Sequence, residues 1–199
     1  MLPPGKIPFV MSQDDLCYYP YMSGDGFADR IVIGEDGKPT CQMTLDDGTV
    51  TTGDYDLVPI LEKFCEQHPD FSYKGARAVL AFTGYEGILG YRTSSSYAGS
   101  ETYDQDRQAA AEVAQCLREH GWELASHSWG HLDLGTVEWD RFQSDTDKWE
   151  SEVESLIGPT DIILFPFGAD LGDWHPYTME NERFRYLYNA GFRYFCNVD

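Results

Sequence analysis

Short, continuous runs of apolar residues mark the places where the chain is expected to form buried strands. Such runs occupy residues 7–11, 76–82, 122–126 and 162–165, and residues 191–199 have the same strand-like composition. A strand of a parallel sheet is covered on both faces, so it shows a continuous apolar run rather than an alternation. The pattern therefore predicts five parallel strands.

Amphipathic stretches lie between the later runs and predict helices. Leu57, Leu61 and Phe64, for example, recur at helical spacing. Alternation of strands with helices is typical of a parallel sheet joined by crossover helices, so we expect an α/β fold. The expected helices cover residues 54–67, 104–120, 137–157 and 177–190.

A long insertion separates the first strand from the first helix. Residues 16–29 form a loop rich in tyrosine and glycine, and residues 30–33 and 40–45 flank an Asp-Gly turn. Asp-Gly between such runs is a strong hairpin signal, and a second Asp-Gly pair follows shortly afterwards. We expect a β-hairpin insertion over about residues 16–53, within a single domain that spans residues 1–199.

Charge and cysteine content narrow the classes of partner and site. The chain has 34 acidic and 14 basic residues and a formal net charge of −20, so binding to nucleic acid is not expected. No apolar run approaches the roughly 20 residues that span a bilayer, so no membrane span is expected. Five widely spaced cysteines without a Cys-x-x-Cys pair argue against a disulfide scaffold or a cysteine zinc site. We expect these cysteines to be mostly buried.

Three polar clusters follow predicted strands: Asp14-Asp15, Ser-His-Ser-Trp-Gly-His at 126–131, and Pro-Phe-Gly at 166–168. Sites in α/β folds lie at the carboxyl ends of strands. His127 and His131 are four residues apart, so both would lie on one face if the segment turned into a helix. That is the geometry of two ligands on one metal ion. Spacing alone also fits two ordinary loop histidines.

The aspartate pair could supply an anionic third ligand. Two histidines and one carboxylate form a facial ligand set that leaves positions open for water and substrate. Because neighbouring residues at a strand end point to opposite faces, one carboxylate can bind the ion while the other turns toward the water as general base. The residues therefore favour a divalent metal site in which Asp14 and Asp15 have different roles.

These clusters, with Phe-Pro-Phe-Gly at 165–168 as the third, resemble the three leading motifs of the polysaccharide deacetylase family, the NodB homology domain. The resemblance covers about residues 7–199. It implies a distorted (β/α) barrel, here incomplete at the C-terminus. It also implies metal-dependent removal of acetyl groups from N- or O-acetylated sugars of chitin-like or peptidoglycan polysaccharides. The implied ion is usually zinc and sometimes cobalt or nickel.

The resemblance further implies roles for individual residues. Asp14 would be the catalytic base. Asp15, His127 and His131 would bind the metal ion. The backbone N–H of Phe167 would stabilise an oxyanion. Residues that we expect to contact sugar lie in predicted loops or in family-like motifs: Tyr18, Tyr19, Tyr91, Trp129, Pro166, Asp173 and Trp174.

The chain departs from the family pattern in two places. Leu164 and Phe165 stand where the family usually carries an arginine that orients the base, and no histidine follows His175. The family takes its general acid from a histidine near the C-terminus, so we expect the domain to continue beyond Asp199.

The alternative functions are a sugar-binding domain with impaired catalysis and a metal-dependent hydrolase of a non-sugar amide.

The start of the chain bears on localisation. Residues 1–6 lack the apolar region of a signal peptide and resemble a linker. From the family resemblance we expect the full-length protein to be secreted or on the cell surface, while a cytoplasmic location stays open. The sequence does not determine the oligomeric state.

A second aspartate pair competes for the site. Thr-Leu-Asp-Asp-Gly at 44–48 matches the usual motif of the family better than the residues around Asp14-Asp15 do, and a predicted helix follows it a few residues later. Residues 39–45, however, alternate polar and apolar side chains, which is typical of a half-exposed hairpin strand. We therefore prefer the first pair and keep Asp46 and Asp47 as the alternative.

Overall fold

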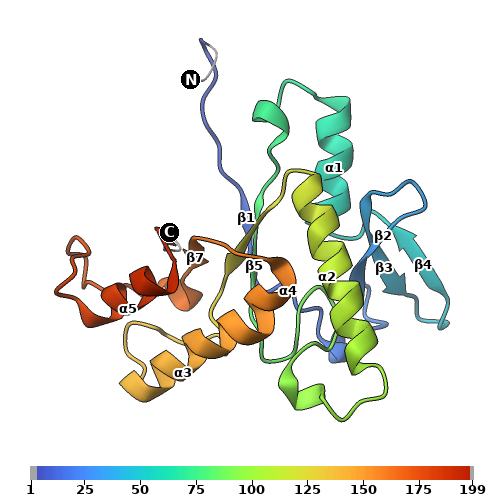
Figure 1. The fold of residues 1–199 in the computed structure, drawn as a ribbon. Helices are drawn as coiled ribbons and strands as arrows, with labels where there is room; N and C mark the ends of the chain where they lie inside the picture. The colour runs from blue at the N-terminus through green and yellow to red at the C-terminus, as the bar shows by residue number, and fades with distance from the viewer. Residues whose placement is uncertain (1–3, 198–199) are drawn as a thin grey trace.

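A curled sheet of five parallel strands, shaped like half of a barrel, forms the centre of the molecule (Figure 1). The computed structural model describes residues 4–197. Residues 1–3 and 198–199, which the sequence assigns to the linker-like start and the last strand, lie outside that range. Every neighbouring pair of strands is parallel, as predicted. In spatial order the strands are β1 Ser12–Gln13, β5 Val79–Phe82, β6 Glu123–Ser126, β7 Ile162–Leu164 and β8 Tyr194–Cys196.

The helices lie close to their predicted positions. They are α1 Leu57–Gln67, α2 Tyr103–Glu119, α3 Trp139–Trp149, α4 Ser155–Ile157 and α5 Glu182–Ala190. A π-helical turn at Glu150–Glu154 joins α3 to α4 within the helix predicted over 137–157. α5 begins later than predicted because the Asn181 side chain accepts a hydrogen bond from the N–H of Phe184 and caps the helix there. Short 3₁₀ turns occupy Pro20–Met22, Tyr73–Gly75, Ser95–Tyr97 and Pro166–Gly168.

The apolar run before β1 is exposed, so its prediction as a buried strand is wrong. Ile7, Phe9 and Val10 are 89%, 73% and 83% exposed, and only Ser12–Gln13 pairs with β5. β1 is an edge strand, and the segment before it extends away from the body of the molecule (Figure 1). Composition shows that a run is apolar, but it does not show whether another element covers the run.

The insertion forms an antiparallel sheet of three strands, β2 Arg30–Ile33, β3 Pro39–Thr44 and β4 Val50–Gly53. The predicted hairpin is the β2–β3 pair, and the second Asp-Gly turn leads into β4. Gly37 and Gly48 have φ of 80° and 82°, the left-handed conformation that glycine supplies in such turns. The N–H of Ile31 donates to the carbonyl of Leu89, which ties the insertion to the loop after β5.

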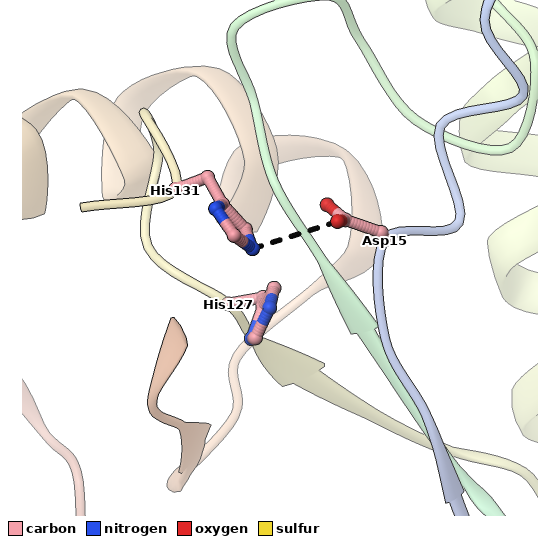
Figure 2. Close-up of side chains that lie close together, drawn as sticks. All are labelled: Asp15, His127 and His131. Carbon is pink, nitrogen blue, oxygen red and sulfur yellow. Dashed lines mark ion pairs between the residues drawn. The ribbon is translucent and has the colours of Figure 1, made fainter. Parts of the chain in front are cut away.

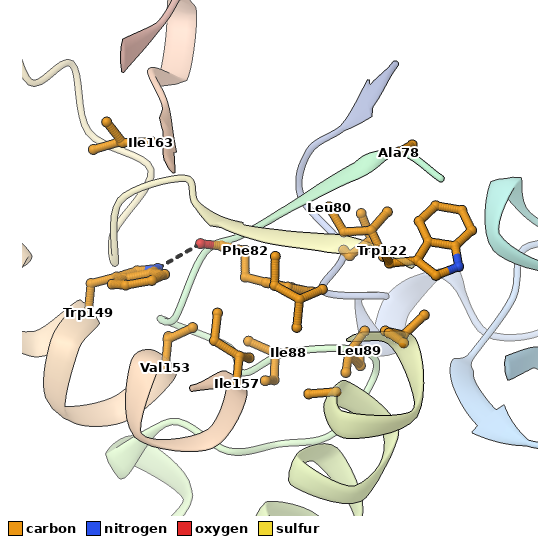
Figure 3. Close-up of a cluster of buried hydrophobic side chains, with 14 of the residues drawn as sticks. Ala78, Leu80, Phe82, Ile88, Leu89, Trp122, Trp149, Val153, Ile157 and Ile163 are labelled. Atoms are coloured by element: carbon orange, nitrogen blue, oxygen red, sulfur yellow. Dashed lines mark hydrogen bonds between the residues drawn. The ribbon is translucent and has the colours of Figure 1, made fainter. Parts of the chain in front are cut away.

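The two faces of the parallel sheet are packed differently. Leu80 and Phe82 of β5 belong to the large core between the sheet and the helices (Figure 3). Ala81, which lies between them, and Ala125 of β6 belong to a much smaller cluster on the opposite face. The indole N–H of buried Trp149 donates to the carbonyl of Phe82 at 2.9 Å, which fixes α3 at the carboxyl end of β5.

Most of the cysteines lie inside the fold. All five cysteines are free thiols; four are buried, as predicted, and Cys196 is exposed. In the described part of the chain, no helix combines the length and the apolar character needed to cross a bilayer.

A buried carboxylate ties α1 to the starts of two strands. Glu62 is 5% exposed, and its two oxygens accept hydrogen bonds from Trp122 Nε1 at 2.7 Å and from Arg77 Nη2 at 3.0 Å. Arg77 lies just before β5, and Trp122 lies just before β6. The charge of Glu62 is thus compensated inside the fold, and loss of Arg77 would leave that charge without its cation.

Arg77→Met is expected to lower the free energy of unfolding by about 3 kcal/mol, because it leaves the buried Glu62 carboxylate without its ion-pair partner. Lys63→Met is the control and should have a far smaller effect, since Lys63 pairs with Asp54 at the surface, where solvent screens the charges. Urea unfolding followed by circular dichroism measures both variants. Equal losses for the two would contradict the special role of the buried pair.

Candidate metal centre

Asp15, His127 and His131 converge near the carboxyl ends of β1 and β6 (Figure 2). Asp15 lies two residues beyond β1, and His127 follows directly after β6. One ligand atom from each of the three residues lies within 4.8 Å of the other two. The two imidazole centroids are 4.9 Å apart and the rings meet edge to face. The three side chains can therefore bind a single ion.

The segment that carries the two histidines is a loop and not a helix. Ser128 and His131 have φ of 57° and 51°, in the left-handed region that residues other than glycine rarely adopt. This tight loop, rather than one face of a helix, brings the two imidazole rings together.

Asp145 of α3 holds this loop in place. Its carboxylate accepts hydrogen bonds from the N–H of Trp129 at 2.8 Å and from the N–H of Gly130 at 2.7 Å, and the residue is buried. Burial raises the pKa of Asp145, while these two hydrogen bonds act in the opposite direction. Asp145 was not predicted, although a carboxylate on the apolar face of an amphipathic helix is a signal of such an anchor.

His127 is buried, and a backbone carbonyl fixes the orientation of its ring. Its Nδ1 lies 2.9 Å from the carbonyl oxygen of Leu164, an arrangement that places the proton on Nδ1 and leaves a lone pair on Nε2. Burial lowers the pKa of His127, and the Leu164 carbonyl and the Asp14 carboxylate oppose this shift. A neutral imidazole whose other nitrogen donates to a carbonyl is a typical metal ligand.

The two adjacent aspartates face different histidines. Asp14 Oδ2 lies 3.5 Å from His127 Nε2, and Asp15 Oδ2 lies 3.5 Å from His131 Nε2. The Thr83 hydroxyl donates to Asp15 Oδ1 at 3.4 Å. Asp15 has a φ of 55°, which interrupts the alternation of an extended strand. Both carboxylates therefore reach the histidine pair, whereas a regular strand would turn them apart.

Asp46 and Asp47 lie elsewhere, in the turn between β3 and β4. The Asp47 carboxylate accepts a hydrogen bond from the N–H of Thr49 at 2.9 Å, and this bond lowers the pKa of Asp47. Neither residue belongs to the converging group within residues 4–197. In this structure the alternative aspartate pair shapes a hairpin turn.

The Pro-Phe-Gly turn after β7 lies against the histidine loop. Phe167 has a φ of 61°, and its ring packs edge-on against His131 with the centroids 4.6 Å apart. Phe167 is 71% exposed, whereas Pro166 is buried. The structure thus brings the third polar cluster to the same edge of the sheet as the other two.

Two of the tyrosines predicted to contact sugar lie near the centre, and a third does not. Tyr18 and Tyr19 line a cavity to which Asp15 also belongs. Tyr91 is 6% exposed, and its hydroxyl donates to the carbonyl of Ile31 at 3.0 Å. The structure corrects the prediction for Tyr91, because its ring packs in the core and its hydroxyl already has a partner.

Trp129, Asp173 and Trp174 stay predictions as sugar contacts. The Trp129 indole donates to Glu152 at 3.1 Å, and the Lys148 ammonium lies 4.3 Å from its ring centroid. Trp174 is 88% exposed in the loop after the Pro-Phe-Gly turn, and Asp173 beside it is also exposed. Within residues 4–197, none of the three belongs to the converging ligand group.

No protein-family model and no curated protein sequence matches this chain. The geometry of the site is therefore the basis for inferring its function.

Asp145→Ala is expected to weaken Zn²⁺ binding by about 10- to 100-fold, because two N–H groups of the histidine loop lose the acceptor that orients the ligands. Asp140→Ala, on the exposed side of the same helix, is the control and should leave the affinity unchanged. Isothermal titration calorimetry with Zn²⁺ measures both variants, and circular dichroism verifies that they are folded. Unchanged Zn²⁺ affinity in folded Asp145→Ala would rule out this role for Asp145.

Proposed function

We propose that this protein is a metal-dependent hydrolase that removes acetyl groups from N- or O-acetylated sugars of a polysaccharide. The observation that carries the proposal is the convergence of Asp15, His127 and His131, with Asp14 beside them. These residues lie at the edge of a curled parallel sheet. We further propose that this sheet belongs to an incomplete, distorted barrel of the polysaccharide deacetylase type.

The donor atoms suit a divalent transition metal ion. Two imidazole nitrogens and one carboxylate oxygen are common ligands of Zn²⁺, and Co²⁺ or Ni²⁺ accept similar sets. Three protein ligands leave positions for water and for a substrate oxygen. The hydrogen bond between His127 Nδ1 and Leu164 supports ligation through Nε2.

The residues around this group would divide the work of hydrolysis. A divalent ion held there supplies Lewis acidity, which polarises an acetyl carbonyl and makes water more acidic. Asp14, whose side chain is 54% exposed beside His127, accepts the proton of the attacking water. The backbone N–H of Phe167 donates to the oxyanion that develops on the acetyl group.

One observation favours a second function, which is sugar binding without turnover. Leu164 and Phe165 precede Pro166 at the position where the polysaccharide deacetylases usually carry an arginine that orients the base. Both side chains are buried and apolar, so this strand offers Asp14 no cationic partner. A domain of this kind would bind metal and sugar but release little acetate.

Acetate release from N-acetylglucosamine oligomers by the Zn²⁺-loaded protein tests the proposal. Asp14→Asn is expected to lower kcat by about 10²- to 10⁴-fold, the contribution of a general base, while Zn²⁺ affinity changes little. Asp47→Asn removes a carboxylate from the β3–β4 turn and is the control that should retain the wild-type rate.

The outcomes separate the candidate functions. Zn²⁺ and sugar binding without acetate release supports the sugar-binding domain. Release only from an N-acetylated compound that is not a sugar assigns the site to another substrate class. A wild-type rate in Asp14→Asn contradicts the role of Asp14 as the base.

Asp15→Ala is expected to lose tight Zn²⁺ binding, because it removes the carboxylate member of the ligand group. Asp47→Ala should bind Zn²⁺ as the wild type does, since Asp47 lies in a surface turn. Calorimetric titration of the two folded variants measures the difference. Loss of Zn²⁺ in Asp47→Ala with retention in Asp15→Ala would move the site to the alternative pair.

A further inference from the structure

A cavity of about 450 Å³ opens beside the candidate metal centre, and Asp15 belongs to both. Its walls come from the segment after β1, from the loop before β2 and from the residues just before α1. A volume of this size is in the range of small-molecule binding sites. Five aromatic side chains line the cavity: Tyr18, Tyr19, Tyr21, Phe27 and Tyr55.

Two of these rings form an aromatic platform. Tyr19 and Tyr21 stack with their centroids 5.3 Å apart and their planes 18° from parallel. Tyr21 is 75% exposed, and the Tyr19 hydroxyl is hydrogen-bonded to the hydroxyl of Tyr85 in the loop after β5. Tyrosine offers a sugar ring an apolar face for its C–H groups and a hydroxyl for hydrogen bonding. Stacking covers one face of each ring, and the remaining face of the exposed Tyr21 suits a pyranose ring.

The inner wall of the cavity is held by hydrogen bonds. The Tyr18 hydroxyl donates to Asp56 Oδ2 at 2.6 Å, and Gln13 Nε2 donates to the same carboxylate at 3.1 Å. The N–H of Leu57 donates to Asp56 Oδ1 at 2.7 Å, so Asp56 also caps α1. Burial is the main cause that holds the pKa of Tyr18 far above its ordinary value, and the charge of Asp56 is the second. The Tyr18 hydroxyl therefore stays protonated and remains a donor. Such a wall needs little ordering when a ligand binds.

The charge of the cavity distinguishes between kinds of sugar. Asp15 and Asp56 line it, and no lysine, arginine or histidine does so among the described residues. If Asp15 binds a metal ion, the carboxylate of Asp56 still has no cationic partner within residues 4–197. An acidic ligand would enter without a cation to pair with and would be repelled. A sugar without an acidic group meets no such penalty.

We propose that this cavity is a subsite for the sugar unit next to the one whose acetyl group faces the metal centre, and that it accepts units without acidic groups. The inference rests on the proposed function and names its substrate class. The protein then prefers neutral, chitin-like chains of N-acetylglucosamine. Chains that alternate N-acetylglucosamine with N-acetylmuramic acid, whose free lactyl carboxylates are negatively charged, bind less well.

Calorimetric binding to the Zn²⁺-loaded protein tests this proposal with two probes. One is the N-acetylglucosamine tetramer, and the other is a tetrasaccharide that alternates N-acetylglucosamine with N-acetylmuramic acid. The wild type is expected to bind the neutral tetramer about tenfold more tightly or better. Tyr21→Ala should weaken binding of the neutral tetramer by about tenfold, because it removes half of the aromatic platform. Tyr194→Ala is the control. Tyr194 is also exposed, but it lies on β8, the outer strand on the opposite side of the sheet from β1.

Phe27→Lys tests the charge argument in the same assay. Phe27 lines the cavity and is 52% exposed, so a lysine there adds a cation with little disturbance of the core. This variant should bind the acidic tetrasaccharide more tightly than the wild type does. The difference in affinity between the neutral and the acidic probe should therefore become smaller. Circular dichroism verifies that each variant is folded.

The outcomes distinguish a failure of the subsite from a failure of the proposed function. Wild-type affinity for the neutral tetramer in Tyr21→Ala overturns the subsite, and equal wild-type affinity for both probes overturns the selection by charge. Acetate release together with binding that does not depend on Tyr21 keeps the proposed function and overturns the subsite. If binding depends on Tyr21 but no acetate is released, the subsite is supported and the proposed hydrolysis is contradicted.

Discussion

Parallel pairing of the strands is the constraint on which the candidate site depends. Backbone hydrogen bonds between the strands align Gln13 of β1 with Leu80 of β5, and Ser126 of β6 with Ile163 of β7. Because these strands run in the same direction, their carboxyl ends lie at one edge of the sheet. Side chains that are far apart in the sequence then meet just beyond that edge, where the loops are free to carry polar groups. Asp15, His127 and His131 use this arrangement (Figure 2). Phe167 of the Pro-Phe-Gly turn uses it too, since its ring packs against His131.

The site concentrates backbone conformations that cost free energy. Asp15, Ser128, His131 and Phe167 all have positive φ, which costs on the order of 1 kcal/mol or more for a residue with a side chain. The surrounding structure stabilises these turns: Asp145 accepts two N–H groups of the histidine loop, and its helix is fixed to the end of β5 by a buried indole. The side chains are thus held in position by rigid neighbours, as ligand groups need to be.

The insertion adds a second chemical environment beside the first. The converging group offers imidazole nitrogens and a carboxylate, which suit a cation. The neighbouring cavity offers aromatic rings and the carboxylate of Asp56, which suit an uncharged ring and disfavour an anion. Asp15 lies at the junction of the two. In the proposed function, the metal centre acts on the acetyl group while the cavity contacts the neighbouring sugar, so chemistry and selectivity reside in different elements of the fold.

The local elements and the chemical groups of the site could be predicted from the amino-acid sequence. Apolar runs and amphipathic periods located β5 to β8 and the helices, because both patterns arise from burial within one element. Residue types and their position after strands pointed to Asp15 and to the two histidines. Three features became evident only in the folded chain: the run at 7–11 is exposed, Tyr91 is buried, and Asp145 anchors the histidine loop. Sequence patterns report the tendency of a segment to be buried. Its covering elements, its hydrogen-bond partners and its turn geometry are set by segments that fold against it from elsewhere in the chain.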